Sequence, residues 1–166
     1  ATIEQFDELI LVNDSCYGPL FDLEPICDAM TSSTCDYWGM TSSREISFHL
    51  QSYFLVFKKS VIDNADFRKF WSEVVAENFY NDIVKKYEVG LSTTLIRNGL
   101  SHESYIDSRL NENLTTFPIT TIKDKNLPFI KIKVFRSPYL SSRERISLLW
   151  IYLKQNHSDM AGMIAR

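Results

Sequence analysis

The alternation of apolar and polar positions predicts several short strands in the first two thirds of the chain. The apolar run in Glu8–Val12 predicts a short buried strand, which stops in the polar triplet 13–15. Residues 35–40 have the pattern of a second short strand. Aromatic and β-branched residues predominate over 49–61 and predict a third, and 104–106 predicts a short fourth.

Apolar residues at helical spacing predict helices between and after these strands. The two most regular apolar stripes lie in 64–77 and 80–98, and the second stops at Asn98-Gly99, a common helix C-terminus. A further helix is predicted over 20–30.

The last part of the chain is expected to be irregular over 111–137 and then helical. Ser141 and Glu144 have the spacing of a capping box and predict the start of this last helix. Trp71 and Trp150 both lie on apolar helical stripes, so both are expected in the core.

Strands that alternate with helices favour the α/β class. With 166 residues, 45% of them hydrophobic, the chain can build the core of one domain. Residues 1–110 are expected to form the main α/β portion with the strand-end Asn-Asp motif. Residues 111–166 are expected to form an irregular segment and a helix that pack on the same domain.

Several classes of protein are not expected. The apolar runs are far shorter than the roughly 20 residues of a membrane-spanning helix, and no secretory leader is recognisable. Cys16, Cys27 and Cys35 form no CxxC pair, so we expect reduced thiols of a cytosolic protein rather than structural zinc. The net charge of −3, with mixed signs, argues against nucleic acid as a partner. The motifs of P-loop proteins, serine hydrolases and zinc proteases are absent from the sequence.

The polar segment 13–19 is the first candidate site. A carboxylate directly after a strand, here Asp14, can bind a divalent cation, and that cation can neutralise a diphosphate leaving group. The alternative is an Asx-turn in which Asn13 or Asp14 only satisfies nearby backbone amides, and the spacing alone favours this alternative.

Two further segments could contact a substrate. Gln51 and Tyr53 would share one face of a strand and could bind sugar hydroxyls while an aromatic ring stacks on the sugar. The pattern fits an edge strand with an exposed polar face equally well. Glu88 lies at the margin of an apolar helical stripe, where a carboxylate in a cleft could accept a proton. A solvated surface glutamate is the commoner case for such a position.

Taken together and in this order, these segments resemble the rhamnan synthesis protein F family. The resemblance covers nearly the whole chain and is carried by Leu9–Leu20, Asp36–Thr41, His49–Phe57, Lys86–Ser92, Pro128–Lys131 and Phe135.

The resemblance implies a glycosyltransferase of bacterial cell-wall or O-antigen polysaccharide synthesis. Such an enzyme transfers rhamnose or a related sugar, with inversion, from a dTDP-activated donor to a glycan or lipid-linked glycan acceptor. The implied fold is a GT-A-like nucleotide-sugar transferase fold, of which this chain would be the C-terminal, acceptor-side portion within a longer synthase. The implied location is the cytoplasm, at the inner face of the membrane.

The resemblance also implies roles for individual residues. Glu88 takes the position of the general base, and Asp14 that of the catalytic carboxylate that binds Mg or Mn beside the diphosphate. Asn13 stands where such a metal motif normally has a second carboxylate. The residues expected to bind substrate are Asn13, Ser15, Tyr17, Gly18, Trp38, His49, Gln51, Ser52 and Tyr53.

Two other functions fit the same residues. A carbohydrate-binding or assembly module without catalysis would use Tyr17, Trp38 and Tyr53 as stacking platforms. A scaffold would only dock against the rest of a multi-domain synthase. Release of nucleotide that depends on Glu88 would favour the transferase, whereas saturable glycan binding without turnover would favour the binding module.

Overall fold

The computed structural model describes residues 2–108, 114, 118–136 and 143–165. The chain divides into two compact units. The first unit comprises Ala1–Asn13 and Asp28–Glu112, and the second comprises Asp14–Cys27 and Asn113–Arg166. Helix α1 (Glu24–Thr31) contains the second of these boundaries. The second unit thus combines a segment near the start of the chain with its last third.

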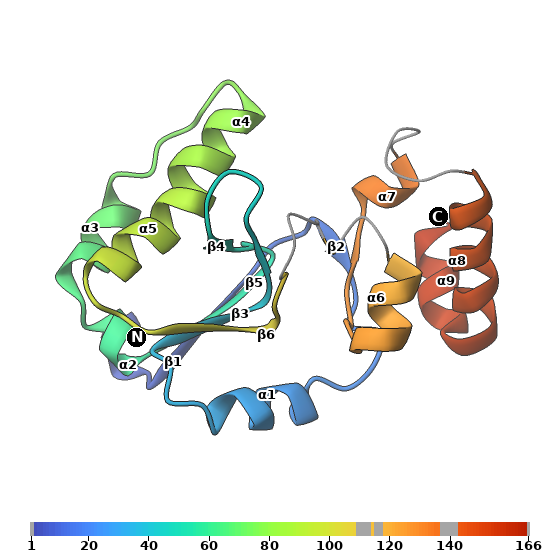
Figure 1. Ribbon diagram of the computed structural model, residues 1–166, viewed down its shortest axis with the longest axis horizontal. Coiled ribbons are helices and arrows are strands. Elements are labelled where there is room, and N and C mark those ends of the chain that lie inside the picture. The colour runs from blue at the N-terminus through green and yellow to red at the C-terminus, as the bar shows by residue number, and fades with distance from the viewer. Residues whose placement is uncertain (1, 109–113, 115–117, 137–142, 166) are drawn as a thin grey trace. The chain divides into compact units, whose positions relative to one another are not determined.

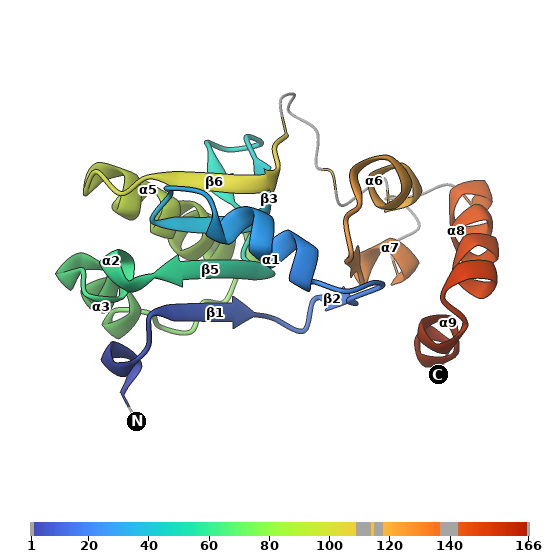
Figure 2. The same ribbon diagram turned by 90° about the horizontal axis from the view of Figure 1, so that it is seen from below.

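A mixed sheet forms the centre of the first unit (Figure 1). Strand β1 (Glu8–Val12) pairs with β5 (Phe54–Lys58), and β5 pairs with β3 (Tyr37–Ser43), both antiparallel. Strand β6 (His102–Ile106) runs parallel to β3 on its other side. Figure 2 shows β6, β3, β5 and β1 side by side in that order. The predicted α/β class is therefore confirmed at the level of a mixed α/β unit.

Strand β1 lies where predicted, but the prediction that it is buried is wrong. Leu9 and Leu11 pack against the core, whereas Ile10 is 51% and Val12 65% exposed. Successive side chains of a strand point to opposite faces of the sheet, so Leu9 and Leu11 reach the core while Ile10 and Val12 lie on the other face. Every residue of β3, by contrast, is buried, and β3 has paired strands along both of its edges.

The predicted strand over 49–61 is divided into three elements. Strand β4 (His49–Leu50) pairs with the end of β3, a turn follows, and β5 leads directly into helix α2 (Lys59–Ile62). The turn interrupts this pairing without reversing the chain, because β4 and β5 both run antiparallel to β3. Residues 51–53 therefore form a corner between the two paired stretches, beside the last part of β3.

Helices α3 (Ala65–Ser72) and α5 (Gly90–Arg97) cover one face of the sheet (Figure 1). The Asn64 side chain caps α3 by accepting hydrogen bonds from the amides of Asp66 and Phe67, which fixes its start at the predicted place. Between the sheet and these helices lies an apolar core of Tyr37, Leu50, Leu55, Phe57, Val61, Phe67, Leu91 and Leu95.

The two predicted long helices differ in outcome. Helix α3 ends at Ser72 rather than at 77, and Trp71 is 41% exposed, so its predicted place in the core is wrong. The helix predicted over 80–98 is confirmed. It consists of α4 (Tyr80–Ile83), a π-helical stretch (Val84–Val89) and α5, and it ends before Gly99 at φ +75°.

The second unit contains a short ladder and helices. Strands β2 (Cys16–Tyr17) and β7 (Ile130–Lys131) pair antiparallel. The helices of this part are α6 (Pro118–Lys125), α7 (Lys133–Arg136), α8 (Arg143–Asn156) and α9 (Ser158–Ile164). Their core is made by Leu20, Ile122, Ile130, Val134, Leu149, Leu153 and Ala161.

The last predicted helix corresponds to α8. Ser141 of the predicted capping box lies outside the described residues. Trp150 is half-buried and packs against Phe135, so it borders the core rather than filling it. Within the described part of the chain, no helix has both the length and the apolar character needed to span a membrane.

Candidate functional site

Three candidate residues from different segments meet at the corner formed by residues 51–53 in the first unit. The Glu88 carboxylate accepts a hydrogen bond from the Ser52 amide at 2.7 Å, and the Asn13 side-chain amide donates to the Ser52 carbonyl at 3.4 Å. One residue of the corner therefore receives contacts from the end of β1 on one side and from the helix on the other.

The helix holds this corner at two points. Glu88 and Ser92 are four residues apart, so they lie on the same helix face. Ser92 Oγ accepts from the Leu50 amide at 3.1 Å, as Glu88 does from the Ser52 amide. Glu88 is half-buried at this place. Its carboxylate is thus held in a defined orientation at the edge of the core.

The charge of Glu88 acts on a tyrosine of the same helix. Partial burial raises the pKa of Tyr80, and the negative charges of Glu88 and Glu45 raise it further.

Gln51 and Tyr53 do not present their polar atoms to solvent as the sugar-binding prediction requires. Both are buried, at 6% and 2% exposure, and both contact Thr41 of β3. Thr41 Oγ1 donates to Gln51 Oε1 at 2.7 Å and lies 2.8 Å from the Tyr53 hydroxyl. These side chains brace the corner from inside, because a buried polar group must find its partners within the protein.

His49 and Trp38 are also interior residues. His49 is 3% exposed and its Nδ1 lies 2.9 Å from the Ser47 carbonyl oxygen. Trp38 is 2% exposed and packs against Phe54, so its ring faces are covered and offer no stacking platform to a sugar.

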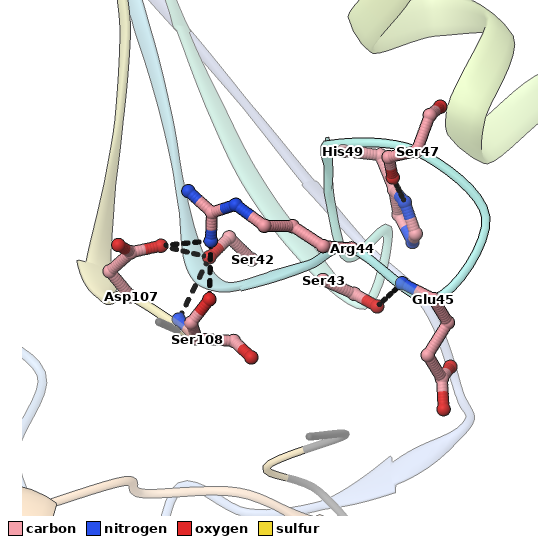
Figure 3. A network of polar contacts seen from close by, with 8 residues as sticks. All are labelled: Ser42, Ser43, Arg44, Glu45, Ser47, His49, Asp107 and Ser108. Carbon is pink, nitrogen blue, oxygen red and sulfur yellow. Dashed lines mark hydrogen bonds and ion pairs between the residues drawn. The ribbon is translucent and has the colours of Figure 1, made fainter. Parts of the chain in front are cut away.

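A polar network at the carboxyl ends of the parallel strands β3 and β6 was not predicted (Figure 3). Arg44 pairs with Asp107 at 2.9 Å and also donates to the Ser108 carbonyl oxygen. Ser42 Oγ donates to Asp107 at 2.6 Å and accepts from the Ser108 amide at 3.0 Å. The sequence signal was the polar run 41–44 at the end of an otherwise apolar strand, a typical place for a ligand site in α/β sheets.

The second unit brings two other candidate segments together. Cys16 and Tyr17 pair with Lys131 and Ile130, and Lys131 Nζ donates to Ser15 Oγ at 3.2 Å. The start of the chain's first candidate site thus contacts the Pro-Phe-Ile-Lys segment more than a hundred residues later.

Gly18 makes this contact possible. Its φ is +147°, and a Cβ there would lie 2.5 Å from the Pro128 carbonyl oxygen and 2.6 Å from the Phe129 ring. Only glycine fits such an approach. Tyr17 packs edge-on against Phe135 in the same unit. Ser15, Tyr17 and Gly18 therefore share one locality.

Asp14 is exposed at the start of the second unit, and a cation there would have few protein ligands. Among the described residues, no three His, Cys, Asp or Glu side chains lie close enough together to hold a metal ion. Asn13, the neighbouring position of the motif, directs its amide nitrogen to Ser52. In the described part of the chain, the residues around Asp14 do not complete a metal site on their own.

Comparisons with known proteins bear on the whole chain. The sequence model described as rhamnan synthesis protein F matches residues 1–161. Two sequences of the virulence protein VirA of Vibrio anguillarum, one from strain ATCC 68554 / 775, are each 28% identical over 142 residues. These alignments cover 84% of this chain and 41% of VirA, so the chain matches about two fifths of the length of these relatives. No solved structure matches the chain.

Proposed function

The chain belongs to the rhamnan synthesis protein F family, and from this premise we propose that it carries the acceptor side of an inverting glycosyltransferase. The donor is a nucleotide-activated sugar of the dTDP-rhamnose kind, and the acceptor is a glycan or lipid-linked glycan. The proposed fold is GT-A-like. The proposed location is the cytoplasmic face of the membrane, where the chain would act as part of a longer synthase.

The observation that carries this proposal is the position of Glu88. Its carboxylate is half-buried at a corner of the sheet and is oriented by the Ser52 amide at 2.7 Å. A general base needs a fixed orientation and access to the proton that it removes. The Ser52 amide gives the Glu88 carboxylate a fixed orientation, and partial exposure leaves the side chain in contact with solvent, which supports the proposed role.

The proposed reaction is a single displacement. The acceptor hydroxyl oxygen attacks the anomeric carbon of the donor sugar, and the bond between that carbon and the diphosphate oxygen breaks. Glu88 takes the proton of the acceptor hydroxyl, and the nucleoside diphosphate leaves with the bonding electrons. Attack on the face opposite the leaving group inverts the anomeric configuration.

The other candidates take supporting roles in this proposal. Asp14, Ser15, Tyr17 and Gly18 lie in the second unit and are the residues proposed for binding of the donor. The buried residues Gln51, Tyr53 and His49 act as positioning residues, because they hold the shape of the corner that presents Ser52 and Glu88.

The test is a transfer assay with the full-length protein, dTDP-rhamnose and a rhamnose-containing oligosaccharide acceptor. We expect dTDP release that depends on the acceptor, and NMR of the product should show an anomeric configuration opposite to that of the donor. Saturable binding of the oligosaccharide without any dTDP release would instead identify a carbohydrate-binding module and reject the proposal.

A further inference from the structure

We propose that Tyr87 is a positioning residue for Glu88, because its hydroxyl ties the helix turn that carries Glu88 to segment 75–77. This inference rests on the proposed function, since it concerns the orientation of the proposed general base. All the residues that it uses belong to the first unit.

The geometry begins at the Tyr87 hydroxyl. It accepts a hydrogen bond from the Val75 amide at 3.1 Å. It also lies 3.0 Å from the Val75 carbonyl oxygen and 3.0 Å from Glu77 Oε1, either of which can accept its proton. Lys86 Nζ donates to the same Glu77 oxygen at 2.8 Å, and the Glu77 side chain is only 12% exposed. Two consecutive residues of the helix therefore hold segment 75–77.

The next residue of the helix, Glu88, contacts a different segment. Its carboxylate accepts a hydrogen bond from the Ser52 amide at 2.7 Å. Residues 86–88 thus contact two segments that are distant from each other in the sequence. Because Tyr87 and Glu88 are adjacent in the backbone, a shift of the turn at Tyr87 would move the Glu88 carboxylate relative to the Ser52 amide.

The local helix geometry makes this support necessary. Residues 86–88 lie within the π-helical stretch Val84–Val89, between α4 and α5. π-helical turns are rare in proteins, and they occur frequently at functional sites. Since α-helical geometry is far commoner, contacts with other segments are needed to favour the wider turn. Lys86, Tyr87 and Glu88 supply such contacts.

The first test measures hydrogen exchange of backbone amides in the full chain and needs no substrate. Tyr87→Phe removes the hydroxyl and keeps the ring, which packs edge-on against Phe70. Exchange of the Ser52 amide should become about three- to tenfold faster, because its hydrogen bond to Glu88 is made for less of the time. The Val56 amide in β5 is the reference, and its exchange rate should change less.

The second test is the transfer assay. A misplaced catalytic group lowers turnover rather than binding, so kcat of Tyr87→Phe should fall roughly ten- to hundredfold while KM for donor and acceptor stays close to wild type. The double variant Tyr87→Phe with Glu88→Gln should turn over no more slowly than Glu88→Gln alone, because Tyr87 acts only through Glu88. Tyr105→Phe, which removes the hydroxyl of a half-buried tyrosine in β6, is the matched control and should behave like wild type in both tests.

Unchanged exchange of the Ser52 amide in Tyr87→Phe would overturn the inference, as would a normal kcat. An equal increase at Ser52 and Val56 would also overturn it, because that result indicates a general loss of stability. If exchange at Ser52 rises specifically and the wild type shows no transfer, the link between Tyr87 and Glu88 stands and only the proposed function fails. If the wild type transfers sugar and Tyr87→Phe behaves like it in both tests, only this inference fails.

Discussion

The two regions that carry the proposed chemistry are stabilised in different ways. In the first unit, side chains supply much of what holds the corner at Ser52, namely Glu88 and Ser92 from the helix and Thr41 from the sheet, beside a backbone bond from Gln51 to Thr41. In the second unit, the segment around Ser15 is held mainly by backbone pairing with β7 and by the close approach at Gly18. A site held by side chains can be weakened one hydrogen bond at a time, whereas a site held by the backbone is vulnerable to a single added carbon atom.

The largest effect on stability is expected for Gly18→Ala, which tests the backbone approach in the second unit. The added Cβ would overlap with the Pro128 carbonyl and would strain the backbone at φ +147°. We expect a loss of about 2–5 kcal/mol in the free energy of unfolding, measured by urea denaturation. Gly162→Ala in α9 is the control. No atom lies within 4 Å of its added Cβ, so it should be neutral or slightly stabilising. Equal stability of the two variants would show that Gly18 does not constrain the second unit.

A smaller effect is expected when one hydroxyl is removed from the first unit. Thr41→Val keeps the volume of the side chain but loses its hydrogen bonds to Gln51 and Tyr53. Since these partners are buried, the free energy of unfolding should fall by about 1–3 kcal/mol. Thr93→Val is the control, because Thr93 is half-buried and bonds only to the Val89 carbonyl of its own helix. A loss at Thr93 as large as at Thr41 would refute the bracing role of Thr41.

The smallest effect is expected for Asp36 in the first unit, where the free energy of unfolding should depend on pH. Hydrogen bonds from Ser101 and then from Ser60 lower the pKa of Asp36, which precedes β3. A lowered pKa in the folded state means that Asp36 contributes stability above its unfolded pKa of about 3.9, and that this contribution is lost as the pH falls through the folded pKa. Asp36→Asn should cost about 1 kcal/mol at pH 6 and should cost progressively less as the pH is lowered.

The pH series has a simple criterion. Chemical denaturation of wild type and Asp36→Asn is measured from pH 6 down to pH 2. A constant difference between the two proteins across this range would contradict the role assigned to the Asp36 carboxylate.

The positions of most strands and helices in the first unit followed from the sequence, but their burial did not. The pattern of Glu8–Val12 identified a strand correctly, yet apolar composition could not tell that only alternate side chains of this strand reach the core. The end of β3 shows the reverse, namely polar residues that are buried. Thr41, Ser42 and Ser43 are covered by segments that come later in the chain. Burial depends on pairing between distant segments, which local pattern does not encode.

The candidate site shows the same limit. Glu88 and Ser52 were singled out separately, and only the fold joins them through the contact between the helix and the turn. The contact of Ser15 with Lys131 spans more than a hundred residues and had no signal in spacing. The prediction that Trp71 lies in the core was wrong. Trp71 is next to the last residue of α3, and its ring packs on Phe70 of the same helix while 41% of the residue stays exposed.

The most direct test of the central claim compares Glu88→Gln with Asp14→Asn in the full-length protein. Glutamine keeps the shape of Glu88 and can still accept from the Ser52 amide, but it cannot accept the acceptor proton. We expect turnover to fall by about 10²–10⁴-fold, the usual contribution of a positioned general base, with donor binding and thermal unfolding close to wild type. Asp14→Asn should weaken donor binding as well as turnover. Near-normal turnover of Glu88→Gln would contradict the account, because the proton would then be removed elsewhere.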